Sequence, residues 1–399
     1  MLTLDKVYHA SFVLKNIIRK TDMILAPNIN PESEIHLKTE NLQVTGSFKV
    51  RGAAYKISQL SEEEKARGVI ACSAGNHAQG VALAATKNGI KSLICLPDGA
   101  PISKVEATRK YGADICLVEG VYDDAYNKAL ELKDEKGYTF IHPFNDEDVI
   151  AGQGTIGLEI LDQIPDVDVV IVPIGGGGLI SGVAFAIKEL NPNVKVYGVQ
   201  ASGAPSMLKS IDDGKIEKLD SVSTIADGIA VKEPGDITFA MCQKYVDGIV
   251  TVSDDEIAAA ILALIEQQKL ITEGAGAVSV AAAMFNKVDV KGKKVGCVLR
   301  GGIFDVTVLS RVITRGVLKW GRTYSLTIEL LDKPGQLKGV ADIIAKEGGN
   351  VISIHHERAS EGSDINGCYL RIVLETKNFD HIAQIKKALT DAGFIIKSY

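Results

Sequence analysis

The stretch Val172-Pro173-Ile174-Gly175-Gly176-Gly177-Gly178-Leu179-Ile180-Ser181 reads as a buried strand, a loop of four glycines and the start of a helix. The same alternation of apolar strand and helix recurs through residues 1–320. Strands that are apolar along their whole length are typical of a parallel sheet covered by helices on both faces. We therefore predict an α/β fold for residues 1–320. The expected strands are Val69–Ser73, Ser92–Leu96, Asp114–Val118, Val167–Pro173, Val194–Val199 and Lys294–Leu299.

The four glycines predict an anion site. Consecutive glycines carry an entropic cost that an ordinary turn does not require. The unpaired N–H groups at a helix start favour anions, phosphate first among them. No Gly-Lys-Ser/Thr follows, so this is not a P-loop, and Gln200 stands where a dinucleotide fold would place an acidic residue. A flexible turn is the alternative that the stretch alone leaves open.

A second informative stretch is Gly46-Ser47-Phe48-Lys49-Val50-Arg51-Gly52. A lysine amine becomes a nucleophile when desolvation or a cationic neighbour lowers its pKa, and Arg51 is the expected neighbour. Gly46, Ser47 and Gly52 would let a ring approach the backbone, and Phe48 offers it a flat face. Taken alone, Lys49 is equally an ordinary exposed lysine.

The third stretch, Val69–Gly80, reads as a strand, a tight turn at Ser73-Ala74-Gly75-Asn76 and a helix. The free N–H groups at this helix start suit a carboxylate, and Asn76 can hydrogen-bond a ring substituent. An ordinary helix cap is the alternative. A lysine for an aldehyde, glycines for a phosphate and a helix start for a carboxylate together indicate pyridoxal phosphate (PLP) with an amino-acid substrate.

These motifs carry a family resemblance. The chain resembles PLP-dependent threonine/serine dehydratases (threonine ammonia-lyases) of the tryptophan-synthase-β-like fold over essentially its full length. That family implies two parallel-sheet α/β subdomains (fold type II) in residues 1–320, the smaller at about 50–150. It also implies β-elimination of L-threonine to 2-oxobutanoate and ammonia, and of L-serine to pyruvate. The matching motifs are Thr45–Gly52, Ser73–Gly80, Gly175–Leu179, Thr224–Gly228 and Glu273–Gly276.

The resemblance implies roles by position. Lys49 would be the Schiff-base lysine and would take the α-proton, with Phe48 flanking the cofactor ring and Asn76 bonding its phenolic oxygen. Gly228 would line the pocket. The cofactor phosphate would lie on Gly175, Gly176, Gly177, Gly178 and Leu179. The substrate carboxylate would lie on the loop of Ser73, Ala74, Gly75, Asn76 and His77.

One motif departs from the family pattern. The family usually has serine or cysteine facing the pyridine nitrogen, followed by Gly-Gly-Asn, whereas this chain has Arg300 there, followed by Gly301, Gly302, Ile303 and Phe304. Arginine has no acceptor capacity, so it could bond only an unprotonated ring nitrogen. The larger side chain suggests a remodelled pocket. A β-eliminase or racemase for another amino acid therefore stays open, as does a non-catalytic amino-acid-sensing relic.

Two further departures concern racemisation and metals. Ala74 stands where related serine racemases carry a serine that serves as the second proton carrier, which favours elimination. Gln200 and Ser206 stand near the place where those relatives bind a divalent cation through carboxylates. Neutral oxygens alone hold a hard cation poorly, so we predict no metal site.

Residues 324–399 have a different pattern. Their order, βαββαβ, is that of a small ferredoxin-like domain. The strand-turn-helix segment Leu331–Leu337 resembles the corresponding segment of an ACT domain. This resemblance implies that the domain binds an amino-acid effector. A final strand at Phe394–Tyr399 would leave an exposed sheet edge, so we expect a homodimer or homotetramer. The other expected elements are Ser325–Leu331, Gly335–Glu347, Asn350–Glu357, Cys368–Glu375 and Asp380–Ala392.

The composition of the chain limits the binding partners and the cellular location that can be expected. The formal net charge of −6 and the pI near 5.7 argue against nucleic-acid and anionic-membrane partners. No apolar run is long enough to span a bilayer, and the N-terminus lacks a signal-peptide layout. The six cysteines are scattered without a CxxC pair. We expect reduced thiols and a cytoplasmic protein.

Overall fold

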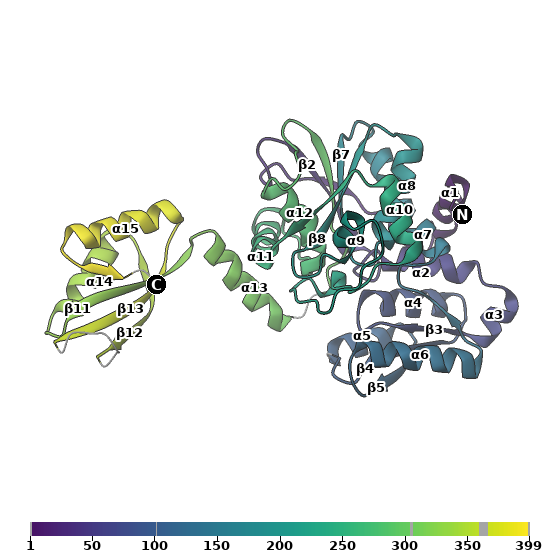
Figure 1. Cartoon of the computed structure of the whole chain (residues 1–399), viewed down its shortest axis with the longest axis horizontal. Coiled ribbons are helices and arrows are strands. Elements are labelled where there is room, and N and C mark those ends of the chain that lie inside the picture. Colours follow the sequence, from purple (N-terminus) through teal and green to yellow (C-terminus); the bar gives the residue numbers. More distant parts are fainter. Residues whose placement is uncertain (1, 101, 304–305, 359–365, 398–399) are drawn as a thin grey trace. The chain divides into compact units, whose positions relative to one another are not determined.

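The computed structural model describes residues 2–100, 102–303, 306–358 and 366–397. The chain forms two compact units, residues 1–306 and 307–399 (Figure 1). This division comes before the predicted boundary between residues 1–320 and 324–399, because helix α13 (Val306–Lys319) falls almost wholly in the second unit. Among the described residues, no helix is long and apolar enough to cross a membrane.

The larger sheet of the first unit has six strands in the order β1-β2-β10-β7-β8-β9. All neighbouring pairs are parallel except β1 with β2. The central strand β7 is buried at every residue, as expected for a sheet covered on both faces. The strands are β1 (Met23–Leu25), β2 (Glu34–Lys38), β7 (Val169–Pro173), β8 (Lys195–Ala201), β9 (Gly248–Val252) and β10 (Lys294–Val298).

The smaller sheet lies within residues 50–150, where the smaller subdomain was predicted. Its four strands are all parallel, in the order β5-β4-β3-β6. The prediction of two parallel-sheet α/β subdomains is therefore confirmed. The strands are β3 (Val69–Cys72), β4 (Ser92–Pro97), β5 (Asp114–Val118) and β6 (Thr139–Phe140).

The helices of the first unit alternate with these strands. Helix α11 is followed directly by a short π-helix at Leu264–Gln268. The helices are α1 (Leu4–Leu14), α2 (Lys49–Ser58), α3 (Glu62–Arg67), α4 (Asn76–Lys87), α5 (Ile102–Lys110), α6 (Tyr122–Lys136), α7 (Glu147–Gln163), α8 (Gly178–Leu190), α9 (Ser206–Asp212), α10 (Asp236–Tyr245), α11 (Asp254–Ala263) and α12 (Gly274–Met284).

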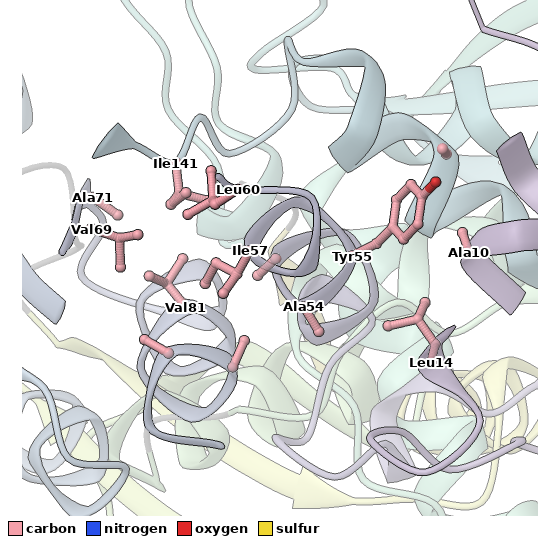
Figure 2. Packing of buried hydrophobic residues seen from close by; sticks show 14 of the residues in the cluster. Ala10, Leu14, Ala54, Tyr55, Ile57, Leu60, Val69, Ala71, Val81 and Ile141 are labelled. Carbon is pink, nitrogen blue, oxygen red and sulfur yellow. The ribbon is translucent and has the colours of Figure 1, made fainter. Parts of the chain in front are cut away.

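Helix α2 is buried between neighbouring elements. Tyr55 and Ile57 of α2 belong to one apolar core with Leu14 of α1, Val81 of α4 and Val69 of β3 (Figure 2). On another side, α2 packs closely on α7: a Cβ at Gly52 would lie 2.4 Å from Gln153 Nε2 and 2.7 Å from the Val149 carbonyl oxygen. The prediction that Gly52 makes room for a ring is therefore wrong, since this glycine lets two helices approach.

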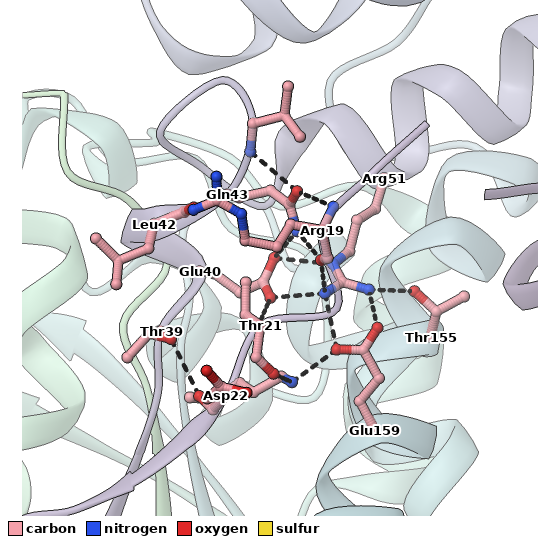
Figure 3. Close-up of polar contacts among 12 residues, drawn as sticks. Arg19, Thr21, Asp22, Thr39, Glu40, Leu42, Gln43, Arg51, Thr155 and Glu159 are labelled. Carbon is pink, nitrogen blue, oxygen red and sulfur yellow. Dashed lines mark hydrogen bonds and ion pairs between the residues drawn. The ribbon is translucent and has the colours of Figure 1, made fainter. Parts of the chain in front are cut away.

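A buried ionic network fixes the first turn of α2 (Figure 3). The Arg51 guanidinium donates to both carboxylate oxygens of Glu40, at 2.8 and 2.7 Å. It also donates to both carboxylate oxygens of Glu159 in α7, at 2.7 and 2.9 Å, and to Thr155 Oγ1 at 3.0 Å. Lys38 donates to Glu159 Oε2 at 2.6 Å. The network therefore pairs two cations with two anions.

The network is almost without water: the side chains of Lys38, Glu40 and Arg51 are fully buried. Burial alone would raise the pKa of Glu40, but the Arg51 charge and its hydrogen bonds hold that pKa below its usual value. A buried ion pair adds little net stability, yet removing one partner strands the other charge. The network therefore specifies where α2 begins.

The second unit has the predicted ferredoxin-like order. Its antiparallel sheet runs β12-β13-β11-β14, which is the arrangement expected for βαββαβ. One face holds the buried core, including Leu326, Ile328 and Val340. Its elements are β11 (Thr323–Leu331), α14 (Gln336–Lys346), β12 (Asn350–Glu357), β13 (Gly367–Glu375), α15 (Phe379–Asp391) and β14 (Ile395–Lys397). The last residues of the predicted strand, Ser398 and Tyr399, lie outside the described residues.

Replacing Arg51 by methionine should destabilise the first unit by about 3–5 kcal/mol, because the fully buried Glu40 would lose the cation that binds both of its oxygens, while Glu159 would keep only Lys38. Urea unfolding followed by circular dichroism measures this loss. Lys20→Met is the control, since it removes a lysine–carboxylate pair with Asp162 in which both side chains are more than half exposed. Equal, small losses for the two variants would contradict the role given to the network.

Candidate active site

The lysine stretch is held against the end of β10. Phe48 N–H donates to the Arg300 carbonyl at 3.1 Å, and Gly302 N–H donates to the Gly46 carbonyl at 2.8 Å. Ser47 and Gly301 form an antiparallel bridge between these two contacts. This pairing places Lys49, the first residue of α2, beside a segment that follows it by some 250 residues. Such a site at the carboxyl end of a sheet strand is where open α/β folds bind ligands.

The Lys49 amine lies in a half-buried pocket. Its Nζ donates to the Pro143 carbonyl and lies 5.4 Å from the centroid of the Phe48 ring. Burial first, and then the positive charge of Arg300, lower the pKa of Lys49 to about 7, while Glu273 acts in the opposite direction. The prediction that Arg51 is the cation that lowers the pKa of Lys49 is wrong, because the Arg51 guanidinium binds Glu40 and Glu159 instead. The amine is a nucleophile near neutral pH.

Arg300 and Glu273 form a buried pair next to this lysine. Arg300 Nη1 lies 3.3 Å from Glu273 Oε1, and its guanidinium carbon lies 5.3 Å from the centroid of the Phe48 ring. Asn76 Nδ2 donates to both oxygens of Glu273, at 2.9 and 3.0 Å. Burial raises the pKa of Glu273, and the Arg300 charge opposes that shift. Sequence reasoning placed Glu273 in a family motif but gave its side chain no role.

The larger side chain of Arg300 is accommodated by a glycine. A Cβ on Gly228 would lie 2.2 Å from Arg300 Nη1, so a residue with a side chain at position 228 would displace the guanidinium. Ile303, which also departs from the family pattern, lies against Gly46: a Cβ there would be 3.4 Å from Ile303 Cγ1. Phe304 lies outside the described residues.

The glycine loop Gly175–Gly178 leads from β7 into α8. Gly177 has a φ of +98°, which few other residues adopt. A Cβ on Gly176 would lie 2.5 Å from the Phe144 ring, and one on Gly178 would lie 2.8 Å from the Phe144 backbone. Side chains at these positions would clash with Phe144, so the glycines let the loop pack closely against it and leave backbone N–H groups as the groups that could face an anion. Leu179 is buried in the core, so its contribution to an anion site is its backbone N–H.

The loop expected to hold a substrate carboxylate, Ser73–His77, connects β3 with α4. Ser73, Ala74 and Gly75 are half-buried, and Asn76 begins the helix. His77 Nε2 donates to the Ile141 carbonyl at 2.8 Å. Burial, followed by the charge of Lys49, lowers the pKa of His77 to about 3, so its ring is neutral. The His77 ring therefore offers no positive charge to an anion. Two backbone N–H groups of the loop are also occupied, since Ser73 N–H donates to the Cys95 carbonyl and Gly75 N–H to Ser73 Oγ, both at 3.2 Å.

A second histidine, which the sequence reasoning did not identify, lies near the lysine. His142 Nδ1 accepts hydrogen bonds from Phe144 N–H at 3.2 Å and Asn145 N–H at 2.8 Å. Burial and the Lys49 charge lower the pKa of His142 to about 4. With both histidines neutral, the charge around Lys49 is set by Arg300 and Glu273.

The residues present fit PLP. Asn76 Oδ1, Ser47 Oγ and Arg300 Nη1 are buried and lack a hydrogen-bond partner within the described chain. Buried polar atoms without partners are rare in folded proteins, so their presence around Lys49 indicates a polar ligand. A ring with hydrogen-bonding substituents would contact Asn76 and Arg300, and a phosphate would contact backbone N–H groups of the loop Gly175–Gly178.

Fold and site together define a fold type II, PLP-dependent enzyme. A family model described as "Pyridoxal-phosphate dependent enzyme" matches residues 14–301, and the chain belongs to this family. It is 49% identical over 399 residues to an L-threonine ammonia-lyase of Thermotoga maritima, covering 100% of this chain and 99% of that protein. An L-threonine ammonia-lyase of Geobacter sulfurreducens is 44% identical, covering 99% of each.

Solved structures agree with this assignment. The processed form of threonine deaminase isoform 2 from Solanum lycopersicum superposes with a TM-score of 0.75 and 38% identity, covering 79% of this chain and 89% of that one. A maize serine racemase also has a TM-score of 0.75, with 34% identity, covering 79% of this chain and 98% of that one. The fold is therefore shared by a threonine deaminase and a serine racemase, which are named for different activities.

In cofactor-free protein, Lys49 should acylate with a half-maximal rate near pH 7, because its neutral fraction rises as pH passes its pKa. Competitive acetylation read by mass spectrometry measures this midpoint against exposed lysines, which titrate near pH 10.4. Arg300→Met removes a positive charge and leaves Glu273, so the midpoint should rise. A rise of about one unit would lower labelling at pH 7 about fivefold.

Arg109→Met is the matched control, because this arginine is exposed on α5 and contacts Glu106. Its Lys49 midpoint should equal that of the parent protein. A midpoint above about pH 9 in the parent protein, or one unmoved by Arg300→Met in a folded variant, would contradict the electrostatic account.

Proposed function

We propose that this chain is an L-threonine ammonia-lyase that converts L-threonine to 2-oxobutanoate and ammonia, and L-serine to pyruvate. The observation that carries the proposal is the Lys49 amine, with its pKa near 7, beside unpaired groups that fit PLP. Relatives named L-threonine ammonia-lyase, 44–49% identical over nearly the whole chain, support the substrate.

The residues proposed to hold the cofactor come from both subdomains. Lys49 would bind its aldehyde carbon, Phe48 would pack on its ring and Asn76 would bond its phenolic oxygen. The N–H groups of Gly175–Gly178 and Leu179 would hold the phosphate. When bound, PLP supplies an electron sink for the charge left on the α-carbon.

Lys49 is also the proposed base. Its amine is half neutral near pH 7, so it can accept the α-proton without a second ionisable group. The Pro143 carbonyl orients the amine, and the neutral rings of His77 and His142 add no competing charge. The backbone N–H groups of Ser73–His77 would hold the substrate carboxylate, with Gly228 lining the pocket.

Arg300 is proposed to face the ring nitrogen of the cofactor. Because its guanidinium only donates hydrogen bonds, it would keep that nitrogen unprotonated. A neutral ring stabilises a carbanion less well, which favours prompt loss of the β-hydroxyl over reprotonation at the α-carbon. Ala74 has no hydroxyl to deliver a proton from the other side. Both residues therefore favour elimination.

A second candidate, a racemase or β-eliminase for another amino acid, is favoured by one observation. Arg300 fills space beside Gly228 in the pocket, and the maize serine racemase shares the fold. A panel of L-amino acids, assayed for oxo acid and for the D-enantiomer, separates the two candidates. D-amino acid formed faster than oxo acid would favour the racemase.

For the second unit we propose an ACT domain that binds an amino-acid effector. This proposal is supported by the ferredoxin-like topology and by the strand-turn-helix segment Leu331–Leu337. We also propose a cytoplasmic homodimer or homotetramer with a place in isoleucine biosynthesis. Size-exclusion chromatography with light scattering tests the assembly.

Purified protein incubated with L-threonine should produce 2-oxobutanoate and ammonia, which a coupled assay measures. Lys49→Ala should lose the visible absorbance of the lysine-bound cofactor and at least about 1,000-fold in kcat, since one residue supplies both the anchor and the base. Lys15→Ala, at an exposed position of the first unit, is the control and should match the parent protein. A yellow protein that forms no product from threonine would overturn the proposed substrate.

Isoleucine or valine should change the threonine concentration for half-maximal rate about 5–150-fold if the second unit senses them, the usual range of allosteric coupling. Steady-state kinetics with each amino acid, paired with calorimetric binding, measures the effect. Alanine at the same concentration is the control ligand. If neither branched-chain amino acid binds or changes the kinetics, the proposed effector class is wrong.

A further inference from the structure

The second unit brings together three side chains that can ligate a metal. Asp332, His356 and Cys368 each offer one donor atom, and these three atoms lie within 4.8 Å of one another. They come from three neighbouring strands: Asp332 directly follows β11, His356 lies near the end of β12, and Cys368 lies near the start of β13. The spacing in sequence gives no sign of this cluster, and the prediction of no metal site considered only the region of Gln200 and Ser206.

Strand register explains why the three side chains meet. Cys368 pairs with Leu330 across β11 and β13, and His356 pairs with Leu370 across β12 and β13. Residues two apart in a strand share a face of the sheet, so Cys368 shares a face with Leu370, and Asp332 continues the face of Leu330. All three therefore lie at the same end of the sheet.

The three donor atoms are of the types that bind Zn²⁺. A thiolate sulfur, an imidazole nitrogen and a carboxylate oxygen are the ligands that Zn²⁺ takes in proteins, at about 2.3, 2.0 and 2.0 Å in a tetrahedron. That geometry requires neighbouring donor atoms about 3.3–3.6 Å apart. His356 Nε2 lies 3.0 Å from Cys368 Sγ, so small side-chain adjustments reach the required spacing. Exposed Asp332 and His356 leave a fourth position open to water.

The charges of the cluster match a divalent cation. Arg358 Nε now lies 3.2 Å from Asp332 Oδ2, on a side chain that is 70% exposed and free to leave. A divalent ion would replace this cation and would be neutralised by one thiolate and one carboxylate.

We propose that Asp332, His356 and Cys368 bind one Zn²⁺ ion, with a water molecule as the fourth ligand. Binding forms the sulfur–zinc bond and breaks the S–H bond of Cys368, and the released proton passes to the buffer. His356 binds as the neutral imidazole and Asp332 as the carboxylate. The ion would join the ends of three strands beside the turn that begins α14. This site is independent of the PLP chemistry proposed for the first unit.

The test uses the full-length protein with PLP present. Zn²⁺ is titrated against a chromogenic chelator, and Co²⁺ is the spectroscopic probe, because a thiolate ligand gives cobalt a charge-transfer band in the near ultraviolet. We expect one ion per chain and about one proton released per ion near pH 7, the latter from calorimetry in buffers of different ionisation enthalpy.

Cys368→Ser should remove the cobalt charge-transfer band, and Cys368→Ser and His356→Gln should each weaken zinc binding at least about 10–100-fold. Cys116→Ser is the matched control, since this half-buried free cysteine lies in the first unit, and it should leave both readouts unchanged. His356 and Asp332 are exposed, so His356→Gln and Asp332→Asn keep the test decisive if Cys368→Ser fails to fold.

Two outcomes would overturn the proposal. One is the lack of stoichiometric Zn²⁺ binding to the parent protein at micromolar concentration. The other is binding that folded His356→Gln and Asp332→Asn leave unchanged, which would assign the ion to other groups, such as the thiols of the first unit. The residues proposed for threonine deamination all lie in the first unit, so loss or retention of that activity in these variants is a separate result.

Discussion

The buried pairing of Arg51 with Glu40 and Glu159 is the constraint on which the catalytic unit depends. The two carboxylates come from different elements, one just after β2 and one from α7, and a bidentate guanidinium meets both only in a single orientation. That orientation fixes the first turn of α2. Because Lys49 is the first residue of the same helix, its amine inherits a defined position without being part of the network. Gly52 allows α2 to approach α7, so packing and charge agree on the placement.

A second, smaller set of charges controls reactivity. Lys49 and Arg300 lie at similar distances from the Phe48 ring, and both are removed from bulk water. Two cations so close cannot both be stable in a medium of low polarity, and only the lysine can lose its proton. The Glu273 carboxylate limits how far the pKa of Lys49 falls. Asn76 donates a hydrogen bond to this carboxylate. Structural charges and reactive charges are thus kept in separate clusters, although Lys49 and Arg51 are two residues apart.

Much of the fold could be read from the sequence, because strand and helix patterns are local. The six expected strands exist, with ends shifted by one or two residues, and the second unit has its predicted element order. The lysine stretch and the glycine loop contact neighbouring residues, Lys49 the Pro143 carbonyl and Gly176 the Phe144 ring, and Asn76 of the Ser73–His77 turn binds Glu273. The errors concern contacts: Arg51 was predicted to be the cationic neighbour of Lys49, and Gly52 to make room for a ring, but both face α7. Phe144 was not predicted because it packs against Gly176 and Gly178, which follow it by more than thirty residues. His142 was not predicted because burial and the Lys49 charge, which lower its pKa, depend on the tertiary structure.

The sequence by itself determined the α/β class and the kind of cofactor and led to the proposal of Lys49 as its anchor, because apolar periodicity and glycine runs express backbone requirements within a few residues. The tertiary structure decided which charges act on that lysine. Electrostatic interaction depends on distance and burial, not on separation along the chain. Arg300 therefore acts on Lys49 from about 250 residues away, whereas Arg51 acts elsewhere. In the same way, only strand register could bring Asp332, His356 and Cys368 to one end of a sheet.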